Sequence, residues 1–258
     1  MQNKFIIHSD YKAIERDAKD AITNFDTYQD ILGDGDRNVI KIITINDKKY
    51  TIKSFKIPNV INQVAYRFFR KSKAERSYQY ANKLLEFGIK TPFPVAYQLE
   101  TTSFLFKRSY YMSELLAYDL TYRELITQPD YPDKEHILRA FTSFTYDLHQ
   151  KGIHFLDHSP GNTLIVKTPS GYDFYLVDLN RMNFGTMDFD TRIYNFCKLT
   201  PKKEMVAIMS NEYAKLTGED ERLIFQKMWG LTEAFQQKYY RKKAWKKRIF
   251  FWKKKYRE

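Results

Sequence analysis

The chain has 258 residues, of which 43% are hydrophobic and 17% aromatic, so it is not disordered and can form one large domain or two lobes. A single cysteine, Cys197, excludes an internal disulfide framework and is typical of a reducing compartment. The net charge is +12, but residues 238–258 hold eleven Lys or Arg and one acid, which leaves the rest almost neutral. The first apolar run, Phe5-Ile6-Ile7, is too short for a signal peptide, and no segment has a membrane-spanning length of apolar residues. We therefore expect a cytoplasmic chain, free or peripheral on a membrane.

The first half of the sequence predicts a small sheet with one main helix. In chain order, the expected elements are strands over 39–45 and 50–55, a helix over 71–87, and strands over 95–100 and 104–112. Asn46-Asp47 forms the tight turn between the first two strands, and Gly88 ends the helix. The helix should bury one stripe, formed by Ala74, Tyr78, Ala81 and Leu85. This order of elements is that of the small lobe of a kinase.

The second half predicts mostly helices around one hairpin. A helix over 134–150 precedes two short strands over 163–166 and 172–177, joined at Thr168-Pro169-Ser170-Gly171, and helices follow from residue 190. The sequence thus predicts a bilobal α+β fold of the protein-kinase type. The expected parts are an N-terminal lobe with the ATP-binding sheet over 1–114, a helical C-terminal lobe over 115–237, and a basic tail over 238–258.

Two carboxylates and an amide occupy the positions that phosphoryl transfer needs. Asp157 lies five residues before Asn162, the spacing of the kinase catalytic loop, where the Asp orients the acceptor hydroxyl and the Asn holds Mg²⁺. Asp178 follows the second hairpin strand, where kinases carry another Mg²⁺-binding Asp. Each residue alone would be read as a cap or turn residue. The combined spacing favours the catalytic and metal site of an ATP-dependent kinase.

Lys53 is the candidate ligand of the ATP phosphates. Strand alternation places Thr51 and Lys53 on one face and Tyr50 and Ile52 on the other. Most lysines on strands are simply solvated. Lys53, however, lies on the strand that precedes the predicted helix, as the ATP-binding lysine of kinases does. Lys56 is the rival, although the strand pattern ends directly after it.

The predicted helix should supply an acid that pairs with the lysine. Glu75 lies about three turns before Gly88, near the middle of the lobe, whereas Glu86 is at the end of the helix. We therefore expect Glu75 to be the partner of Lys53.

A phosphate-covering loop is the weakest motif. Gly33 and Gly35 stand in Leu32-Gly33-Asp34-Gly35-Asp36, which has two glycines but not the full G-x-G-x-x-G pattern. Its two acids would disfavour a phosphate without Mg²⁺ or the nearby Arg37. A phosphate loop and an ordinary turn both fit.

These segments together resemble the lipopolysaccharide kinase family, whose members phosphorylate Kdo (3-deoxy-manno-octulosonic acid) or heptose of the inner core. The likeness is carried by RNVIKI, YTIKSFKIPNVINQVAY, KAERSYQYANKLLEFGIKTPFP, DHSPGNTLIV and VDLNRM, and is most specific in S-P-G-N and D-L-N-R. It implies an ATP- and Mg²⁺-dependent kinase of lipid A-linked Kdo at the inner leaflet. By position it makes Asp157 the catalytic base or hydroxyl-orienting residue, Asn162 and Asp178 the Mg²⁺ ligands, and Lys53 the contact of the ATP phosphates. The KAERSY and SPGNTL segments favour Kdo, and a heptose kinase is the close alternative.

The sequence departs from protein kinases at three places. Phe155-Leu156-Asp157 replaces His-Arg-Asp, Leu179-Asn180 follows Asp178, and no Ala-Pro-Glu comes after it. A peptide-docking activation segment is therefore not expected, which favours a small hydroxyl acceptor. His158 and Arg181 flank the site and would suit an anionic sugar, although a structural role fits His158 equally. An atypical protein or RNA-associated kinase and a non-catalytic scaffold remain the alternatives.

The basic tail has the pattern of an interfacial helix. Trp245, Ile249, Trp252 and Tyr256 fall on one helical face, and lysines occupy much of the remainder. Packing on the helical lobe and nucleic-acid binding are alternatives. A lipid-linked acceptor favours the anionic inner-membrane surface, and no nucleic-acid partner is expected. Nothing in the sequence indicates an oligomeric state.

Overall fold

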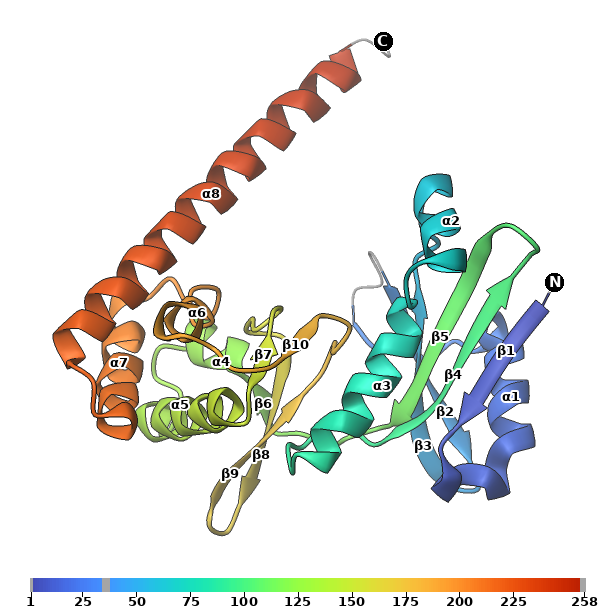
Figure 1. Cartoon of the computed structure of the whole chain (residues 1–258), viewed down its shortest axis with the longest axis horizontal. Helices are drawn as coiled ribbons and strands as arrows, with labels where there is room; N and C mark the ends of the chain where they lie inside the picture. The colour runs from blue at the N-terminus through green and yellow to red at the C-terminus, as the bar shows by residue number, and fades with distance from the viewer. Residues whose placement is uncertain (1, 34–37, 256–258) are drawn as a thin grey trace. The chain divides into compact units, whose positions relative to one another are not determined.

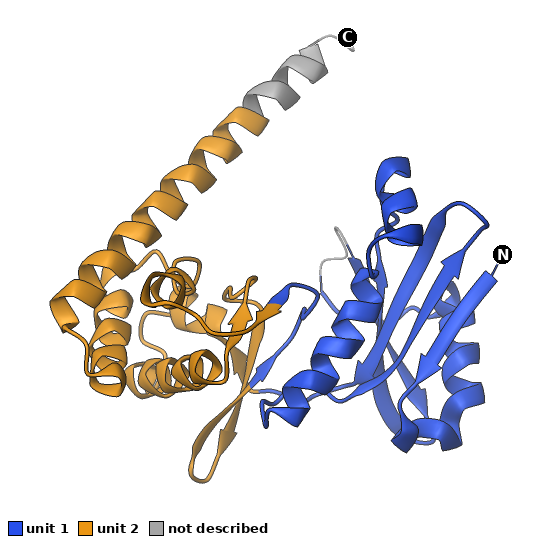
Figure 2. Cartoon of the chain, in the orientation of Figure 1, with its two compact units in different colours: residues 1–118, 175–182 blue, residues 119–174, 183–258 orange. Residues whose placement is uncertain are grey.

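The computed structural model describes the backbone of residues 2–33 and 38–255, with side chains up to residue 246. The chain divides into two compact units (Figures 1 and 2), and each is described by itself. Unit 1 comprises Met1–Tyr118 and Tyr175–Met182, and unit 2 comprises Asp119–Phe174 and Asn183–Glu258. The expected α+β fold is confirmed, because unit 1 is built on a sheet and unit 2 is mostly helical.

Unit 1 contains a five-stranded antiparallel sheet in the order β1-β4-β5-β3-β2 (Figure 1). Its strands are β1 (Gln2–Ile7), β2 (Asn38–Ile45), β3 (Lys48–Phe55), β4 (Pro94–Thr101) and β5 (Phe106–Glu114). Asn46 and Asp47 both have positive φ, 48° and 61°, as a two-residue type I′ hairpin turn requires. The tight turn predicted between the first two strands is therefore confirmed.

The two faces of the sheet are covered by different helices. Tyr50 and Ile52 are buried in a cluster with side chains of α1 (Glu15–Thr23). Phe55 is buried on the opposite face, in a cluster with Ala74 of α3 (Lys73–Glu86). Strand alternation therefore places Lys53 on the α3 face. The first 30 residues were given no element from the sequence, and they supply the edge strand β1, α1 and the short 3₁₀ turns Ser9–Ile14 and Phe25–Thr27.

Helix α3 matches the predicted helix closely. Ser72 caps its start by accepting a hydrogen bond from the Glu75 amide at 3.1 Å, and Gly88 follows its end with φ +70°. The buried stripe consists of Ala74, Ser77, Ala81 and Leu84. Leu84 thus takes the core position expected of Leu85, a shift of one residue along the stripe. A further helix, α2 (Val60–Phe68), was not predicted.

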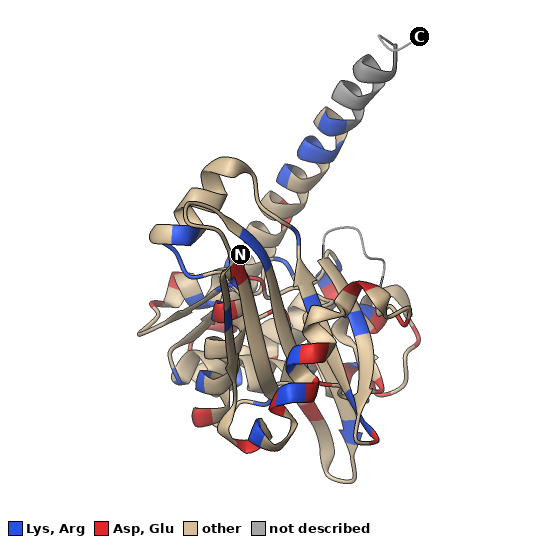
Figure 3. Cartoon of the chain, turned by 90° about the vertical axis from the view of Figure 1, so that its right-hand side faces the viewer, with Lys and Arg blue, Asp and Glu red and all other residues tan. Residues whose placement is uncertain are grey.

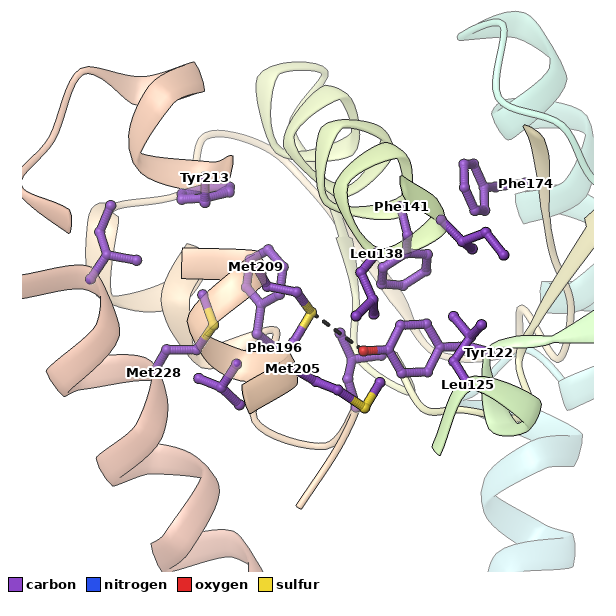
Figure 4. Packing of buried hydrophobic residues seen from close by; sticks show 14 of the residues in the cluster. Tyr122, Leu125, Leu138, Phe141, Phe174, Phe196, Met205, Met209, Tyr213 and Met228 are labelled. Carbon is purple, nitrogen blue, oxygen red and sulfur yellow. Dashed lines mark hydrogen bonds between the residues drawn. The ribbon is translucent and has the colours of Figure 1, made fainter. Parts of the chain in front are cut away.

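Unit 2 packs its helices around an aromatic and methionine-rich core (Figure 4). Its helices are α4 (Tyr122–Thr127), α5 (Lys134–Gln150), α6 (Phe189–Tyr194), α7 (Lys203–Thr217) and α8 (Glu221–Lys255). Phe141 of α5 packs against the ring of Tyr122 at a centroid distance of 4.6 Å. The buried Tyr122 hydroxyl donates to the sulfur of Met209 at 3.4 Å, so the core leaves that polar group satisfied.

Short strands connect α5 to the later helices. Strand β7 (Ile153–Phe155) pairs with β10 (Met182–Phe184), and β6 (Leu120–Thr121), β8 (Thr163–Thr168) and β9 (Gly171–Leu176) form a second sheet in that order. Gly152 leads into β7 with φ +66°, and the Gly185 amide donates to its carbonyl at 2.8 Å. A Cβ at Gly152 would lie 2.7 Å from the Gly185 carbonyl oxygen, so this close approach requires glycine.

Helix α8 continues well beyond its packing within unit 2 (Figure 2). Ile224 and Met228 are buried in the core of the unit, whereas every side chain from 237 to 246 is exposed. The tail is helical as expected, but Trp245 is 65% exposed, which argues against packing on the helical lobe. The side chains of Ile249, Trp252 and Tyr256 lie outside the described residues. Within the described chain, no helix combines the length and the apolar character needed to cross a membrane.

Candidate active site

Lys53 and Asp178 meet inside unit 1. The Lys53 Nζ lies 2.6 Å from Asp178 Oδ1, and its side chain is only 14% exposed. The ammonium also lies 5.3 Å from the centre of the Phe55 ring, on the same face of β3. Lys56, the rival, is exposed beyond the end of the strand. The structure thus brings together the two residues that the sequence assigned to phosphate and metal.

Asp178 is held in an unusual conformation. Its φ is 58°, in the left-handed region, which costs a residue other than glycine about 1–2 kcal/mol. The segment before it is fixed to unit 1, because the Leu176 amide donates to the Lys90 carbonyl and Thr91 Oγ1 donates to the Leu176 carbonyl. Asn180 Nδ2 donates to Asp178 Oδ1 at 2.7 Å. This anchoring offsets the backbone strain and aims the carboxylate at Lys53.

Glu75 does not pair with Lys53, contrary to the expectation from the sequence. Its carboxylate lies 3.6 Å from the Nζ of Lys4, on β1. Strand β1 is separated from β3 by two intervening strands, or about 14 Å at the usual strand spacing. Glu75 sits in the first turn of α3, which places it over the β1 edge. In the described part of the chain, the ion-pair partner of Lys53 is Asp178.

The glycine-containing segment joins two paired stretches of chain. The Leu32 amide donates to the Ile40 carbonyl at 2.8 Å, and the Ile42 amide donates to the Asp30 carbonyl at 2.9 Å. Gly33 has φ +83°, which suits a turn leaving this pairing. Gly35 lies outside the described residues. A role of either glycine at phosphate stays a prediction.

Asp157 and Asn162 form a compact loop in unit 2. Asn162 Nδ2 donates to the Asp157 carbonyl at 2.8 Å, and its amide donates to the Ser159 carbonyl at 2.9 Å. With the nitrogen used in this way, the side-chain oxygen of Asn162 is the atom left for a cation. The Ser-Pro-Gly-Asn stretch therefore forms a turn that orients both candidate residues.

Lys198 is a neighbour of Asp157 that the sequence did not reveal. Its Nζ lies 4.0 Å from Asp157 Oδ1 and donates to the Leu156 carbonyl at 2.5 Å. It follows Cys197 in the stretch after α6, 41 positions from Asp157, and no motif or spacing connects the two residues. Only folding of unit 2 places this cation beside the Asp157–Asn162 loop.

A buried polar network holds the strand before the Asp157–Asn162 loop. Asn195 Nδ2 donates to the Phe155 carbonyl at 2.8 Å, and His149 contacts both Asn195 Oδ1 at 3.2 Å and the Tyr213 hydroxyl at 2.9 Å. Desolvation lowers the pKa of His149 to about 4. Burial beside the rings of Phe141 and Phe155 lowers the pKa of His158 to about 3. His158 is therefore neutral near pH 7, which favours its structural role over binding of an anionic sugar.

Asp178 of unit 1 and Asn162 of unit 2 each offer an oxygen atom of the kind that a hard cation binds. A carboxylate and an amide oxygen are the protein ligands from which Mg²⁺ sites are completed by phosphates and water. Asp178 Oδ2 accepts no hydrogen bond from the described residues, so it is open to a metal. Across the same residues there is no cluster of three or more His, Cys, Asp or Glu side chains. Either residue would therefore need further oxygen ligands, from substrate or water, to hold a metal.

Comparison with solved structures identifies the fold. No family model and no curated protein sequence matches the chain. Many solved chains match it in structure, among them "WaaP in complex with acyl carrier protein", with a TM-score of 0.62 and 14% sequence identity. That match covers 91% of this chain and 97% of the WaaP chain. The chain therefore has the WaaP kinase-like fold.

Proposed function

We propose that this chain is an ATP-dependent kinase that phosphorylates a hydroxyl of Kdo in the lipopolysaccharide inner core. The observation that carries the proposal is the Lys53–Asp178 pair at 2.6 Å, on a chain that also holds the Asp157-x4-Asn162 loop. Phosphoryl transfer depends mainly on positioning and on cations that neutralise the phosphates, and these residues supply both. The WaaP-like fold supports a lipopolysaccharide core kinase.

Each residue has a defined role in this reaction. Lys53 contacts the ATP phosphates through its ammonium, and Asp178 and Asn162 supply oxygen ligands for Mg²⁺. The metal, when bound, neutralises charge on the transferring phosphoryl group. Asp157 accepts the hydrogen bond of the acceptor hydroxyl and aligns its oxygen for attack. Lys198, whose Nζ lies 4.0 Å from Asp157 Oδ1, adds positive charge near the acceptor.

The catalytic loop of unit 2 favours an anionic acceptor. Arg123 of α4 lies against this loop, since a Cβ on Gly161 would stand 2.8 Å from its Nη2. A guanidinium binds a carboxylate in a bidentate manner, and Kdo carries a carboxylate that heptose lacks. The missing activation-segment motifs also disfavour a peptide acceptor. Heptose is the second candidate, because other members of the resembling family act on it.

The direct test is ATP consumption with two acceptors. Kdo-lipid A and a heptose-extended core are each supplied to the full chain, and the phosphorylated product is identified by mass spectrometry. We expect turnover with Kdo-lipid A and a loss of at least about 100-fold in Asp178→Ala. Asp17→Ala, an exposed carboxylate on α1, is the matched control and should retain activity. Sugar-independent or absent turnover by folded protein would refute the proposal, and turnover with heptose alone would change the acceptor.

The exposed part of α8 would keep the enzyme at the cytoplasmic face of the inner membrane. Residues 238–246 contain five Lys or Arg and no acid, and Tyr239, Tyr240 and Trp245 among them are exposed. Figure 3 shows these basic positions following one another along the helix. Anionic lipid attracts such a segment by about 1 kcal/mol for each cation near the surface. Contact with the membrane would bring the enzyme to its lipid-linked acceptor.

A further inference from the structure

Helix α2 of unit 1 exposes its apolar side chains and buries a polar one. Ile61 is 81% exposed and Val60 64%, whereas Gln63 is buried at 8% exposure. Phe68 and Phe69, at the end of the helix, are 53% and 83% exposed. A helix of a globular protein turns its apolar stripe inward, and an exposed continuous apolar surface marks a binding site. The outward side chains of α2 therefore require a partner.

The outward orientation is fixed by the inner side of the helix. Asn59 caps the start by accepting from the Asn62 amide at 3.0 Å, and Gln63 Nε2 donates to the Pro58 carbonyl at 2.9 Å. Tyr66 packs on Phe106 of β5 at a ring-centroid distance of 5.6 Å. Because Gln63 and Tyr66 face inward, helical geometry spreads Val60, Val64, Phe68 and Ile61 over an outward arc of about 100°.

Positive charge surrounds this stripe. Residues 56–74 contain no Asp or Glu and five basic residues, namely Lys56, Arg67, Arg70, Lys71 and Lys73. Figure 3 shows no acidic position on α2. None of the five contacts a carboxylate in the described ranges 2–33 and 38–246. An anionic partner would therefore meet cations that are not already neutralised within the protein.

A cavity of about 510 Å³ opens beside the end of α2. Arg67, Arg70, Lys71 and Lys4 contribute to its lining together with Phe68 and Phe69. Glu75 is the one acid among its lining residues, and Lys4 lies 3.6 Å from it. The cavity thus places basic groups next to the exposed rings of Phe68 and Phe69, as a phosphate headgroup with attached acyl chains requires.

We infer that α2 is an interfacial helix by which unit 1 binds an anionic lipid bilayer. The stripe formed by Val60, Ile61, Val64 and Phe68, continued by Phe69, enters the boundary between headgroups and acyl chains, and the basic residues contact lipid phosphates. A bilayer fits better than a protein groove, because it can accommodate a convex helix with apolar residues along its length and cations on its flanks. The inference does not depend on the kinase activity proposed above.

A local probe separates α2 from the basic tail. In the full chain, Ile61→Cys is labelled with an environment-sensitive fluorophore; the natural Cys197 is buried. We expect a blue shift of emission, and quenching by a spin-labelled lipid, with phosphatidylglycerol-containing vesicles but not with pure phosphatidylcholine. The shift should fall as salt is raised, because screening weakens the lysine and arginine contacts.

Two unlabelled variants test the two halves of the surface. Ile61→Ser with Phe69→Ser should weaken vesicle binding by roughly tenfold or more, since each side chain loses its apolar burial. Arg70→Ala with Lys71→Ala should weaken it several-fold, whereas Arg16→Ala with Lys19→Ala, the same charge change on α1, should not. A probe at residue 61 that stays in water while the protein binds vesicles would overturn the inference. So would a shift produced only by a soluble acidic protein and not by vesicles.

Discussion

The ammonium of Lys53 lies 2.6 Å from the Oδ1 of Asp178, although 125 positions separate the two residues in the sequence. Lys53 is placed by the alternation of β3, and Asp178 by a left-handed backbone whose preceding residues bond to Lys90 and Thr91. The pair is only partly exposed, so the attraction is less screened than on an open surface. A nucleotide with Mg²⁺ would give each charge a partner of its own, a phosphate for Lys53 and the metal for Asp178.

Replacing the lysine is the first prediction. Lys53→Met should lower kcat/KM for ATP by at least about 100-fold, because the phosphates lose a positioned cation. Lys49→Ala is the matched control, since Lys49 is exposed and lies two alternations earlier on the same face of β3. Initial rates at varied ATP measure both variants. Equal losses of kcat/KM in the two variants would show that the net positive charge of the strand, and not the position of Lys53, determines the rate.

Lys198 gives the second prediction. Lys198→Met should lower kcat by about 10- to 100-fold with little change in the KM for ATP, because the cation lies beside Asp157, the residue proposed to align the acceptor hydroxyl. Lys215→Ala, an exposed lysine of α7, serves as control. A raised KM for ATP with unchanged kcat would instead assign Lys198 to nucleotide binding.

Much of the framework could be predicted because its signals are local. The Asn46-Asp47 turn, the capped and glycine-terminated α3, the long α5 and the β8–β9 hairpin each depend on neighbouring residues. The position of Lys53 opposite Tyr50 and Ile52 also follows from strand alternation alone. These elements were sufficient for the α+β fold class.

The parts that were missed depend on distant packing. Glu75 pairs with Lys4 because β1 forms the edge of the sheet next to β4. Nothing in the sequence near Glu75 indicates that β1 lies at this edge. Lys198 reaches Asp157 only through the fold of unit 2. Helix α2 was not predicted, because its apolar residues are exposed. Helix prediction from hydrophobic periodicity assumes that the apolar stripe is buried.

A pair of glycine substitutions tests the close approach of Gly152 to Gly185, at the strand before the Asp157–Asn162 loop. Gly152→Ala and Gly218→Ala each place a side chain at positive φ, 66° and 74°. The first also forces Cβ to within 2.7 Å of the Gly185 carbonyl oxygen, whereas the second meets nothing within 4 Å. We expect Gly218→Ala to lower the free energy of unfolding by about 1–2 kcal/mol and Gly152→Ala by roughly 3 kcal/mol or more. Urea unfolding of both variants measures the difference, and equal costs would contradict the contact.

Buried histidines should make unit 2 sensitive to mild acid. The pKa values of His149 and His158 are lowered by burial to about 4 and about 3, while the unfolded chain protonates near 6.5. The unfolded state therefore binds more protons between these values, so stability is complete above pH 6.5 and falls as the pH decreases. At pH 5.5 the loss is up to about 1.4 kcal/mol for each histidine. Urea midpoints at pH 7.5 and 5.5 measure it, and His158→Leu should reduce the difference; a midpoint independent of pH would contradict the burial.

The last prediction concerns the tail. Deleting residues 238–258 removes eleven Lys or Arg, and all the described side chains of this segment are exposed, so the melting temperature should change little. Binding to anionic vesicles should weaken by at least tenfold, because several cations lose their attraction to the lipid surface. Some binding should persist through α2, and combining the deletion with Ile61→Ser and Phe69→Ser should abolish it. Unchanged vesicle binding after the deletion would refute the membrane role of the tail, and binding to RNA that is lost with the same deletion would assign it to nucleic acid instead.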